Sequence, residues 1–256
     1  MGRVIAIVNQ KGGVGKTTTA VNLSAALAMT GSSVLLIDVD PQASATSGVG
    51  IRVASGELSS YDVLLGQAPA ENALRKTMLP ALQVLPASRD LVGAEIELVA
   101  LERREMRLKE ALGGVRWRYE YIVIDCPPSL GLVTLNALTA SDSLLIPLQC
   151  EYYALEGLTA LLETVGLVRE SLNPDLAIEG LLLTMFDGRN ILSRQVAEDV
   201  RTHFPDKVFG TIVPRNVRLS ESPSHGLPAL LYDPASRGAV AYGELAREVV
   251  ANTDRA

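Results

Sequence analysis

A glycine-rich segment near the start of the chain has the residue types and spacing of a phosphate-binding loop. Glycines let consecutive backbone N–H groups turn inward around a phosphate, and a following helix directs its positive end at the same anion. Gln10 stands where the usual loop has its first glycine, so the segment fits the deviant pattern K-G-G-x-G-K-[ST]. In such a loop Lys16 reaches the β- and γ-phosphates, and the Thr17 hydroxyl completes the shell of a Mg²⁺ ion. The segment comprises Lys11, Gly12, Gly13, Val14, Gly15, Lys16, Thr17 and Thr18.

Three aspartates follow apolar runs elsewhere in the chain and could complete such a site. Asp38 and Asp40 come after the apolar residues 35–37, and Asp125 comes after the apolar residues 122–124. In an open α/β sheet, ligands bind beyond the carboxyl ends of the parallel strands, so these carboxylates and the loop can converge on one nucleotide. A single aspartate at the end of a strand often only caps the next helix, but three of them beside a phosphate-binding loop favour a functional site.

Short apolar runs alternate with longer segments of helical period, and this alternation predicts the elements that position these residues. The predicted strands are residues 4–8, 34–38, 82–86, 121–125, 143–147, 177–184 and 208–213. The predicted helices are residues 16–29, 93–112, 155–172, 192–204 and 235–251. Most of the strands are apolar nearly throughout, as are strands buried on both faces of a parallel sheet. We therefore expect an α/β fold with a doubly wound, mostly parallel sheet flanked by helices.

The organisation of the chain predicts a single domain over residues 1–256, because no repeat, low-complexity tract or linker interrupts it. Residues 44–66 are the least regular stretch, and we expect a loop with a short helix there. Charged residues cluster in the second half of the predicted helix 93–112, which favours a solvent-exposed face over a partner surface.

The composition excludes several classes of protein. Hydrophobic residues make up 48% of the 256 residues and charged residues 20%, which excludes a disordered or fibrous protein. A net charge of −6 gives no global positive field, and 4% aromatic residues argue against binding of single strands by base stacking. No apolar run approaches the ~20 residues of a membrane span, so we expect a cytoplasmic protein. Cys126 and Cys150 are too few for a disulfide framework, and we expect both to be buried, reduced thiols.

These motifs resemble those of the deviant Walker A P-loop ATPases, and further segments narrow the resemblance to the ParA/Soj chromosome- and plasmid-partition ATPases. It covers nearly the whole chain, which begins at the strand before the loop, as in the short type without an amino-terminal helix-turn-helix. Of the matching segments, the last two named below are the more discriminating, because the others occur throughout the deviant group. Besides the loop, the matching segments are DVDPQ (38–42), DCPPSL (125–130), QCEYYALEG (149–157) and PRNVRLSE (214–221).

The resemblance implies that ATP lies in the interface of a homodimer. Lys11 would cross that interface to the phosphates of the partner subunit, as an arginine finger does, so ADP should support the dimer poorly. Gly12 would stay free of a side chain because the partner's backbone approaches there. Pro214 and Asn216 match the family's adenine-binding segment, and Met185 is expected beside them.

The resemblance also implies how Mg²⁺ and the attacking water are held. Thr17, Asp38 and Asp125 would bind Mg²⁺ directly or through water, and Asp40 would position the water. With Lys11 and Lys16, Asp40 makes up the expected catalytic set. Many relatives carry Gly-Asn after the segment 38–42, whereas this chain has alanine and serine there, which leaves the aspartates in place.

Catalysis is expected to be slow without a partner. Phosphoryl transfer depends on positioning and charge neutralisation, and no strong general base is evident in the motifs. In the family the partner is the centromere-binding ParB, whose basic amino-terminal segment stimulates hydrolysis. The resemblance thus implies an ATP- and Mg²⁺-dependent, nucleoid-associated partition ATPase that leaves double-stranded DNA after hydrolysis.

A local positive region could provide the DNA-binding surface. Residues 189–218 contain six basic and three acidic residues, a net charge of +3 in a chain of net charge −6. Arg189 and Arg218 match positions at which the family contacts DNA without sequence preference. Two copies per dimer would sum their phosphate contacts into weak, salt-sensitive binding. The alternative is an arginine-rich face that is merely solvated.

Other functions within the superfamily remain open as alternatives. A membrane-associated septum-site ATPase needs a basic amphipathic helix at its carboxyl end, whereas residues 247–256 are polar and near neutral, so we expect no membrane binding. A reductase like the nitrogenase iron protein holds a cluster with two cysteines per subunit, but Cys126 and Cys150 do not lie where its ligands fall. A nucleotide-gated scaffold would bind ATP without useful turnover.

Overall fold

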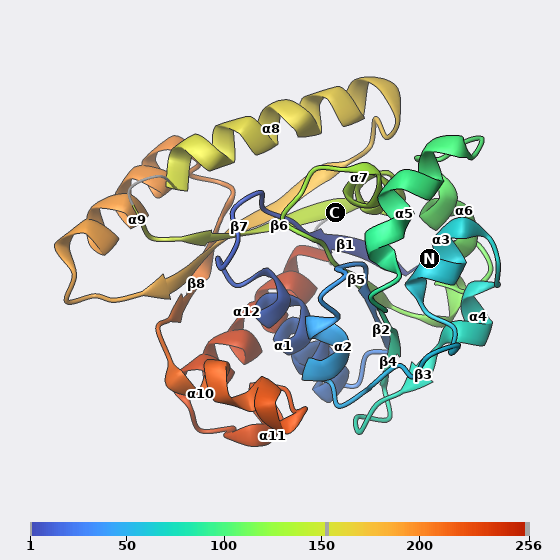
Figure 1. Ribbon diagram of the computed structural model, residues 1–256. Coiled ribbons are helices and arrows are strands. Elements are labelled where there is room, and N and C mark those ends of the chain that lie inside the picture. The colour runs from blue at the N-terminus through green and yellow to red at the C-terminus, as the bar shows by residue number, and fades with distance from the viewer. Residues whose placement is uncertain (1, 152–153, 254–256) are drawn as a thin grey trace.

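The computed structural model describes residues 2–151 and 154–253, and a sheet of eight strands forms the centre of this part (Figure 1). The strand order is β3-β4-β2-β5-β1-β6-β7-β8, and every pair is parallel except β3 with β4. The predicted mostly parallel α/β sheet is therefore confirmed. The strands are β1 (Arg3–Ile7), β2 (Val34–Asp38), β3 (Arg75–Lys76), β4 (Leu82–Leu85), β5 (Tyr121–Asp125), β6 (Ser143–Gln149), β7 (Ala177–Phe186) and β8 (Val208–Pro214).

Helices cover both faces of the sheet, as Figure 1 shows. Alternate residues of a strand point to opposite faces, so each strand contributes to two cores. In β1, Ile5 and Ile7 pack with α1 and α12, whereas Val4 and Ala6 pack with the layer that contains α3 and α5–α9. The helices are α1 (Lys16–Met29), α2 (Ser44–Gly48), α3 (Ser60–Leu65), α4 (Ala70–Ala73), α5 (Leu91–Glu97), α6 (Arg107–Leu112), α7 (Leu132–Ala140), α8 (Ala154–Ser171), α9 (Ile191–His203), α10 (Val217–Glu221), α11 (Ala229–Tyr232) and α12 (Arg237–Thr253).

The prediction of one helix over residues 93–112 is wrong. The chain forms α5, a short 3₁₀ turn (Leu98–Ala100) and then α6. Arg103 between them has a left-handed backbone with φ of 52°. Asn136 on α7 donates to the Arg104 carbonyl oxygen at 2.7 Å and accepts from the Leu108 N–H at 3.1 Å. These contacts satisfy the backbone groups that a continuous helix would have paired.

Other differences are smaller. The seven predicted strands are present within about two residues, but the two-residue edge strand β3 and the helix α7 were not predicted. Residues 44–66 hold two short helices, α2 and α3, and Ser59 caps α3 in a reciprocal pair of hydrogen bonds with Asp62. Cys126 and Cys150 are buried and free, as expected.

Two features of the sequence fall on residues that the structure does not describe. Tyr152 and Tyr153 of the segment 149–157, and residues 254–256 of the carboxyl-terminal segment, lie outside the described residues. Among the residues that are described, no helix combines the length and the apolar character needed to span a bilayer.

Candidate functional site

The glycine-rich loop connects the end of β1 to the start of α1, and its backbone requires glycine at two positions. Gly13 and Gly15 have φ of 76° and 92°, in the left-handed region that residues with a Cβ rarely adopt. Gly15 is also the N-cap of α1, so the free N–H groups of the first turn face the loop. The Thr184 hydroxyl on β7 donates to the Val14 carbonyl oxygen at 2.8 Å and anchors the loop to the sheet.

The Lys16 side chain lies across the glycine-rich loop. It begins α1, its residue surface is only 7% exposed, and its Nζ donates to the Lys11 carbonyl oxygen at 3.1 Å across the loop. Burial lowers the pKa of Lys16, and the nearby carboxyl of Asp125 opposes that shift. The described residues give its ammonium group no ion pair. A lysine in this position is available to an anion in the loop.

Asp38 and Asp125 lie opposite each other on neighbouring strands, and both are fully buried. Asp38 accepts three hydrogen bonds, from the Asp40 N–H at 3.1 Å and from the N–H and hydroxyl of Thr46 at 2.8 Å each. Burial raises the pKa of Asp38 to about 6 against these bonds. Neither carboxylate oxygen of Asp125 has a partner with hydrogen-bond geometry in the described structure, although the Thr17 hydroxyl is near enough to lower its pKa. Burial and then Asp38 raise the pKa of Asp125, which Thr17 and Lys16 oppose.

The unpartnered carboxylate of Asp125 fits a contact with a cation or with the water around one. Buried polar atoms are rarely left without a partner, and each exception in a folded chain needs an explanation. No group of three histidine, cysteine or acidic side chains in the described residues could hold a metal alone. Mg²⁺ is typically bound by one or two carboxylates together with substrate phosphates and water, and that donor set matches Thr17 and Asp125 beside the loop.

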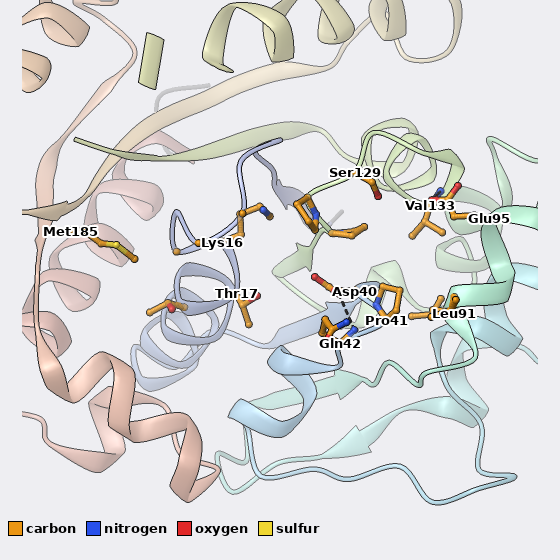
Figure 2. A pocket seen from close by; sticks show the side chains of 17 residues that line it. Lys16, Thr17, Asp40, Pro41, Gln42, Leu91, Glu95, Ser129, Val133 and Met185 are labelled. Carbon is orange, nitrogen blue, oxygen red and sulfur yellow. Dashed lines mark hydrogen bonds between the residues drawn. The ribbon is translucent and has the colours of Figure 1, made fainter. Parts of the chain in front are cut away.

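A cavity of about 670 Å³ opens in front of the loop (Figure 2). Its volume lies in the usual range for small-molecule sites. In Figure 2 Lys16 and Thr17 lie near the centre, with Met185 on one side and Leu91, Glu95 and Val133 on the other. The lining residues are Gly12, Gly13, Gly15, Lys16, Thr17, Thr18, Asp40, Pro41, Gln42, Leu91, Val92, Glu95, Pro127, Pro128, Ser129, Val133 and Met185.

Eight of the residues singled out from the sequence line this cavity: Gly12, Gly13, Gly15, Lys16, Thr17, Thr18, Asp40 and Met185. Val14 turns into the core, and Asp38 and Asp125 are fully buried. Pro214 and Asn216 are not among the lining residues. The Asn216 side chain instead accepts the Arg218 N–H at 2.8 Å and caps α10, while Pro214 pairs with the end of β7.

Met185 forms part of the cavity wall with a strained backbone. Its φ of 51° lies in the left-handed region, which costs a residue with a side chain roughly 1–2 kcal/mol. Such strain clusters at ligand sites. The left-handed backbone of Met185 therefore favours a role in ligand contact, without reference to any family.

Lys11 pairs with an acidic residue of its own chain. Its Nζ lies 3.0 Å from a carboxylate oxygen of Glu151, and the side chains are 41% and 47% exposed. Gln149 donates to the other oxygen of the same carboxylate. Exposed ion pairs are worth little, about 0–1 kcal/mol, so Lys11 can leave Glu151 for a stronger anion at small cost.

The wall formed by α5 and α7 was not predicted from the sequence. Glu95 accepts the N–H groups of Leu132 and Val133 at 2.7 and 3.3 Å and so caps α7. A Cβ on Gly131 would lie 2.3–2.5 Å from the Glu95 carboxylate and would displace it from this position. Only the glycine before an apolar run hinted at this helix start.

The two arginines expected to contact DNA lie beyond the carboxyl ends of neighbouring strands β7 and β8, and both are paired with carboxylates. Arg189 forms two hydrogen bonds of 3.1 Å with Asp187, and its side chain is 92% exposed. Arg218 lies 2.7 Å from Glu221 and 3.1 Å from Asp233.

Comparison with known proteins places the chain in a family. Residues 2–178 match the model of an AAA domain. The sporulation initiation inhibitor protein Soj of Bacillus subtilis (strain 168) is 61% identical over 252 residues, which cover 98% of this chain and 100% of Soj. The chromosome partitioning protein ParA of Caulobacter vibrioides (strain NA1000 / CB15N) is 57% identical over 250 residues, covering 97% of this chain and 94% of ParA.

A solved structure shares the fold and much of the sequence. The structure of cobyrinic acid a,c-diamide synthase from Mycobacterium smegmatis with bound ADP and magnesium superposes with a TM-score of 0.84 at 40% identity, covering 96% of this chain and 93% of that one. The expected resemblance is thereby confirmed. With its deviant phosphate-binding loop at the edge of a mostly parallel sheet, the chain belongs to the ParA/Soj family of chromosome-partitioning ATPases.

Proposed function

We propose that this chain binds ATP with Mg²⁺, forms a homodimer around the nucleotide, and in that state binds double-stranded DNA without sequence preference. Hydrolysis stimulated by a ParB-like protein then releases it, so that a chromosome or plasmid is segregated within the cytoplasm on the nucleoid. The observation that carries this proposal is a pair of neighbouring groups: Lys16, which lines the cavity and has no ion pair, and the buried Asp125, which has no hydrogen bond, both among the described residues.

ATP binding follows from the chemistry of these groups. The loop N–H groups and the Lys16 ammonium group would hold the β- and γ-phosphates. Thr17 and Asp125 would hold Mg²⁺, and Asp38, whose oxygens already accept three hydrogen bonds, would act through a bridging water or by orienting the segment after β2. When bound, Mg²⁺ neutralises charge that develops on the phosphate oxygens. Met185 is the lining residue nearest in sequence to the segment in which the adenine contact is expected.

Asp40 is proposed to position the attacking water. It lines the cavity, and one of its oxygens accepts the Gln42 N–H at 2.9 Å, which fixes the carboxylate and leaves the other oxygen available to water. The only other acidic side chain among the lining residues, Glu95, is engaged in capping α7. Such a site orients water without strongly activating it, which supports slow hydrolysis that a partner accelerates.

Dimer formation is supported by the surface around the loop. A Cβ at Gly12 would meet no atom within 4 Å, and its φ is not positive, so nothing in the described part of the chain requires glycine there. A second subunit packed against Gly12 would leave no room for a side chain there and would explain the glycine. Lys11 beside it, held only by an exposed ion pair, can reach the phosphates of the partner.

DNA binding would use the positive region over residues 189–218. Arg189 and Arg218 are each paired with carboxylates, so contact with DNA exchanges those partners for phosphates. The gain per arginine is then small, and binding depends on having two copies in one dimer. This supports a weak, salt-sensitive interaction that ends when the dimer opens.

ATP hydrolysis with and without DNA and the ParB-like protein of the same organism tests the proposal. We expect slow phosphate release that rises when both are present, no release from Lys16→Ala, and loss of DNA binding without loss of nucleotide binding from Arg189→Glu. DNA binding by Arg189→Glu equal to that of the unmodified protein would place the DNA surface elsewhere. Nucleotide-dependent dimerisation without any stimulated hydrolysis would favour a scaffold.

A further inference from the structure

Helix α5 and the 3₁₀ turn Leu98–Ala100 that continues it are apolar on two sides. Leu91, Ala94 and Leu98 face the core and are fully buried. On the other side Val92, Ile96 and Val99, at spacings of four and three residues, are 68%, 77% and 56% exposed. A surface helix normally presents polar residues to water, and a helix that is apolar all round is normally covered. We call Val92, Ile96 and Val99 the outer face of α5.

The outer face of α5 lies at the rim of the nucleotide cavity. Val92 itself lines the cavity together with Leu91 and Glu95 of the same helix. Figure 2 shows Leu91 and Glu95 on the wall that faces Lys16 and Thr17. The same cavity is lined by Gly12, whose open surroundings support contact with a second subunit. The apolar side chains thus continue the surface that the proposed homodimer covers.

Helix α5 is also fixed to a segment that follows Asp125. The Glu95 carboxylate caps α7, and the three residues 127–129 before that helix line the cavity. The Glu95 side chain therefore links α5 to the start of a helix whose preceding residues line the cavity.

The charge of α5 helps to decide which partner could cover its outer face. The helix carries Glu95 and Glu97 and no lysine or arginine, so an anionic membrane surface would repel it. A two-fold related copy, in contrast, brings an identical apolar face to the same side of the nucleotide. Building on the proposed dimer, we propose that the outer face of α5 packs against a second copy of this chain when ATP is bound.

Sedimentation of hydrolysis-blocked protein tests this inference. In the Asp40→Ala background with ATP and Mg²⁺, Ile96→Asp should raise the dimer dissociation constant about tenfold or more, because it replaces a buried apolar contact by a charge. The milder Ile96→Ser should raise it less. Met78→Asp is the matched control, because Met78 is 71% exposed and precedes the amino end of β4. It therefore lies away from the carboxyl ends of the strands, where the site is.

The outcomes separate this inference from the function on which it rests. If the Asp40→Ala parent stays monomeric with ATP, the proposed dimer is wrong and the inference falls with it. If the parent dimerises and Ile96→Asp dimerises equally well, only the inference is wrong. An equal loss in Met78→Asp would also overturn it, since the effect would not depend on α5. Binding of a fluorescent ATP analogue to each monomer, unchanged among the three variants, shows that folding is intact.

Discussion

At the scale of single residues, two aspartates with the same sequence context have opposite surroundings. Asp38 and Asp125 both end apolar runs, and sequence pattern alone assigns them the same role. In the structure Asp38 accepts three hydrogen bonds while Asp125 accepts none. The difference depends mainly on Thr46, which lies on the short helix α2 and donates two hydrogen bonds to Asp38 at the end of β2. The hydrophobic pattern of the sequence can place a carboxylate at the end of a strand. Its hydrogen-bond partners come from the segment after β2, whose path no periodic pattern predicts.

Exchanging each aspartate should therefore affect the ligand-free protein differently. Asp125→Asn removes a buried carboxylate without a partner and should raise the free energy of unfolding by about 1 kcal/mol, while weakening Mg²⁺-dependent ATP binding. Asp38→Ala leaves the Thr46 N–H and hydroxyl unpaired and should lower the free energy of unfolding by about 2–3 kcal/mol. Urea denaturation without nucleotide measures both. Equal destabilisation by the two variants would contradict the assignment of Asp125 as a ligand-facing group.

The Cys150 thiol should react slowly in the folded protein. Burial raises its pKa to about 11 from 9.0, so the thiolate fraction near neutral pH falls about 100-fold. Because the folded pKa lies above the unfolded one, this group's contribution to stability is complete below pH 9 and is lost as the pH rises through 11. Iodoacetamide labelling followed by peptide mass spectrometry checks the prediction. Labelling of Cys150 as fast in the native protein as in urea would refute it.

At the scale of elements, the buried strands and α1 were predictable, whereas the boundaries of α5, α6 and α7 on the other face of the sheet were not. Most of the strands are buried on both faces, so each one is visible in the sequence as a continuous apolar run. The start of α6 after the break depends on the Asn136 side chain, which lies on α7 and binds the Arg104 carbonyl oxygen before α6 and the Leu108 N–H within it. Helix α7 in turn is capped by Glu95 from α5. The starts of α6 and α7 are thus each set by a side chain from a helix distant in the sequence, and no local window contains both.

The start of α2 carries strain that a single substitution should relieve. Ala43, the N-cap residue of α2, has a φ of 52°. Ala43→Gly should raise the free energy of unfolding by about 0.5–1 kcal/mol, because glycine adopts this conformation without a steric penalty. The reverse exchange at Gly31, with φ of 100° and open space around it, should cost about 1 kcal/mol. Thermal unfolding compares the two, and a loss of stability in Ala43→Gly would show that its Cβ contacts outweigh the strain.

The cap that Glu95 provides should be measurable separately from any interface. Glu95→Ala removes the acceptor for two N–H groups at the start of α7 and should lower the free energy of unfolding by about 1 kcal/mol. Glu97→Ala, on the same helix, removes only an exposed hydrogen bond from the Tyr61 hydroxyl and should have less than half that effect. Both are read by urea denaturation of the ligand-free protein. A larger effect at Glu97 would mean that the cap does not stabilise α7.

At the scale of the whole molecule, the parts of the site that were predictable lie at the ends of strands, and the parts that were not come from helices. The loop after β1 and the aspartates after β2 and β5 meet at one edge because parallel strands share their carboxyl ends. The wall of α5 and α7 on that edge follows from packing between layers. Likewise, sequence charge located the positive region, but only the structure shows that Arg189 and Arg218 are paired with carboxylates.

The proposed dimer makes different demands on two adjacent glycines. Gly12 has no internal reason to be glycine, so Gly12→Val should fold normally and bind ATP within about tenfold of the parent, yet stay monomeric because the added side chain blocks the second subunit. Gly13 has φ of 76°, so Gly13→Val should distort the loop and weaken ATP binding itself. In the Asp40→Ala background, sedimentation velocity with ATP and with ADP separates these effects. A Gly12→Val protein that still dimerises with ATP would show that the subunits do not meet at this position, and the in-trans role of Lys11 would then lose its structural basis.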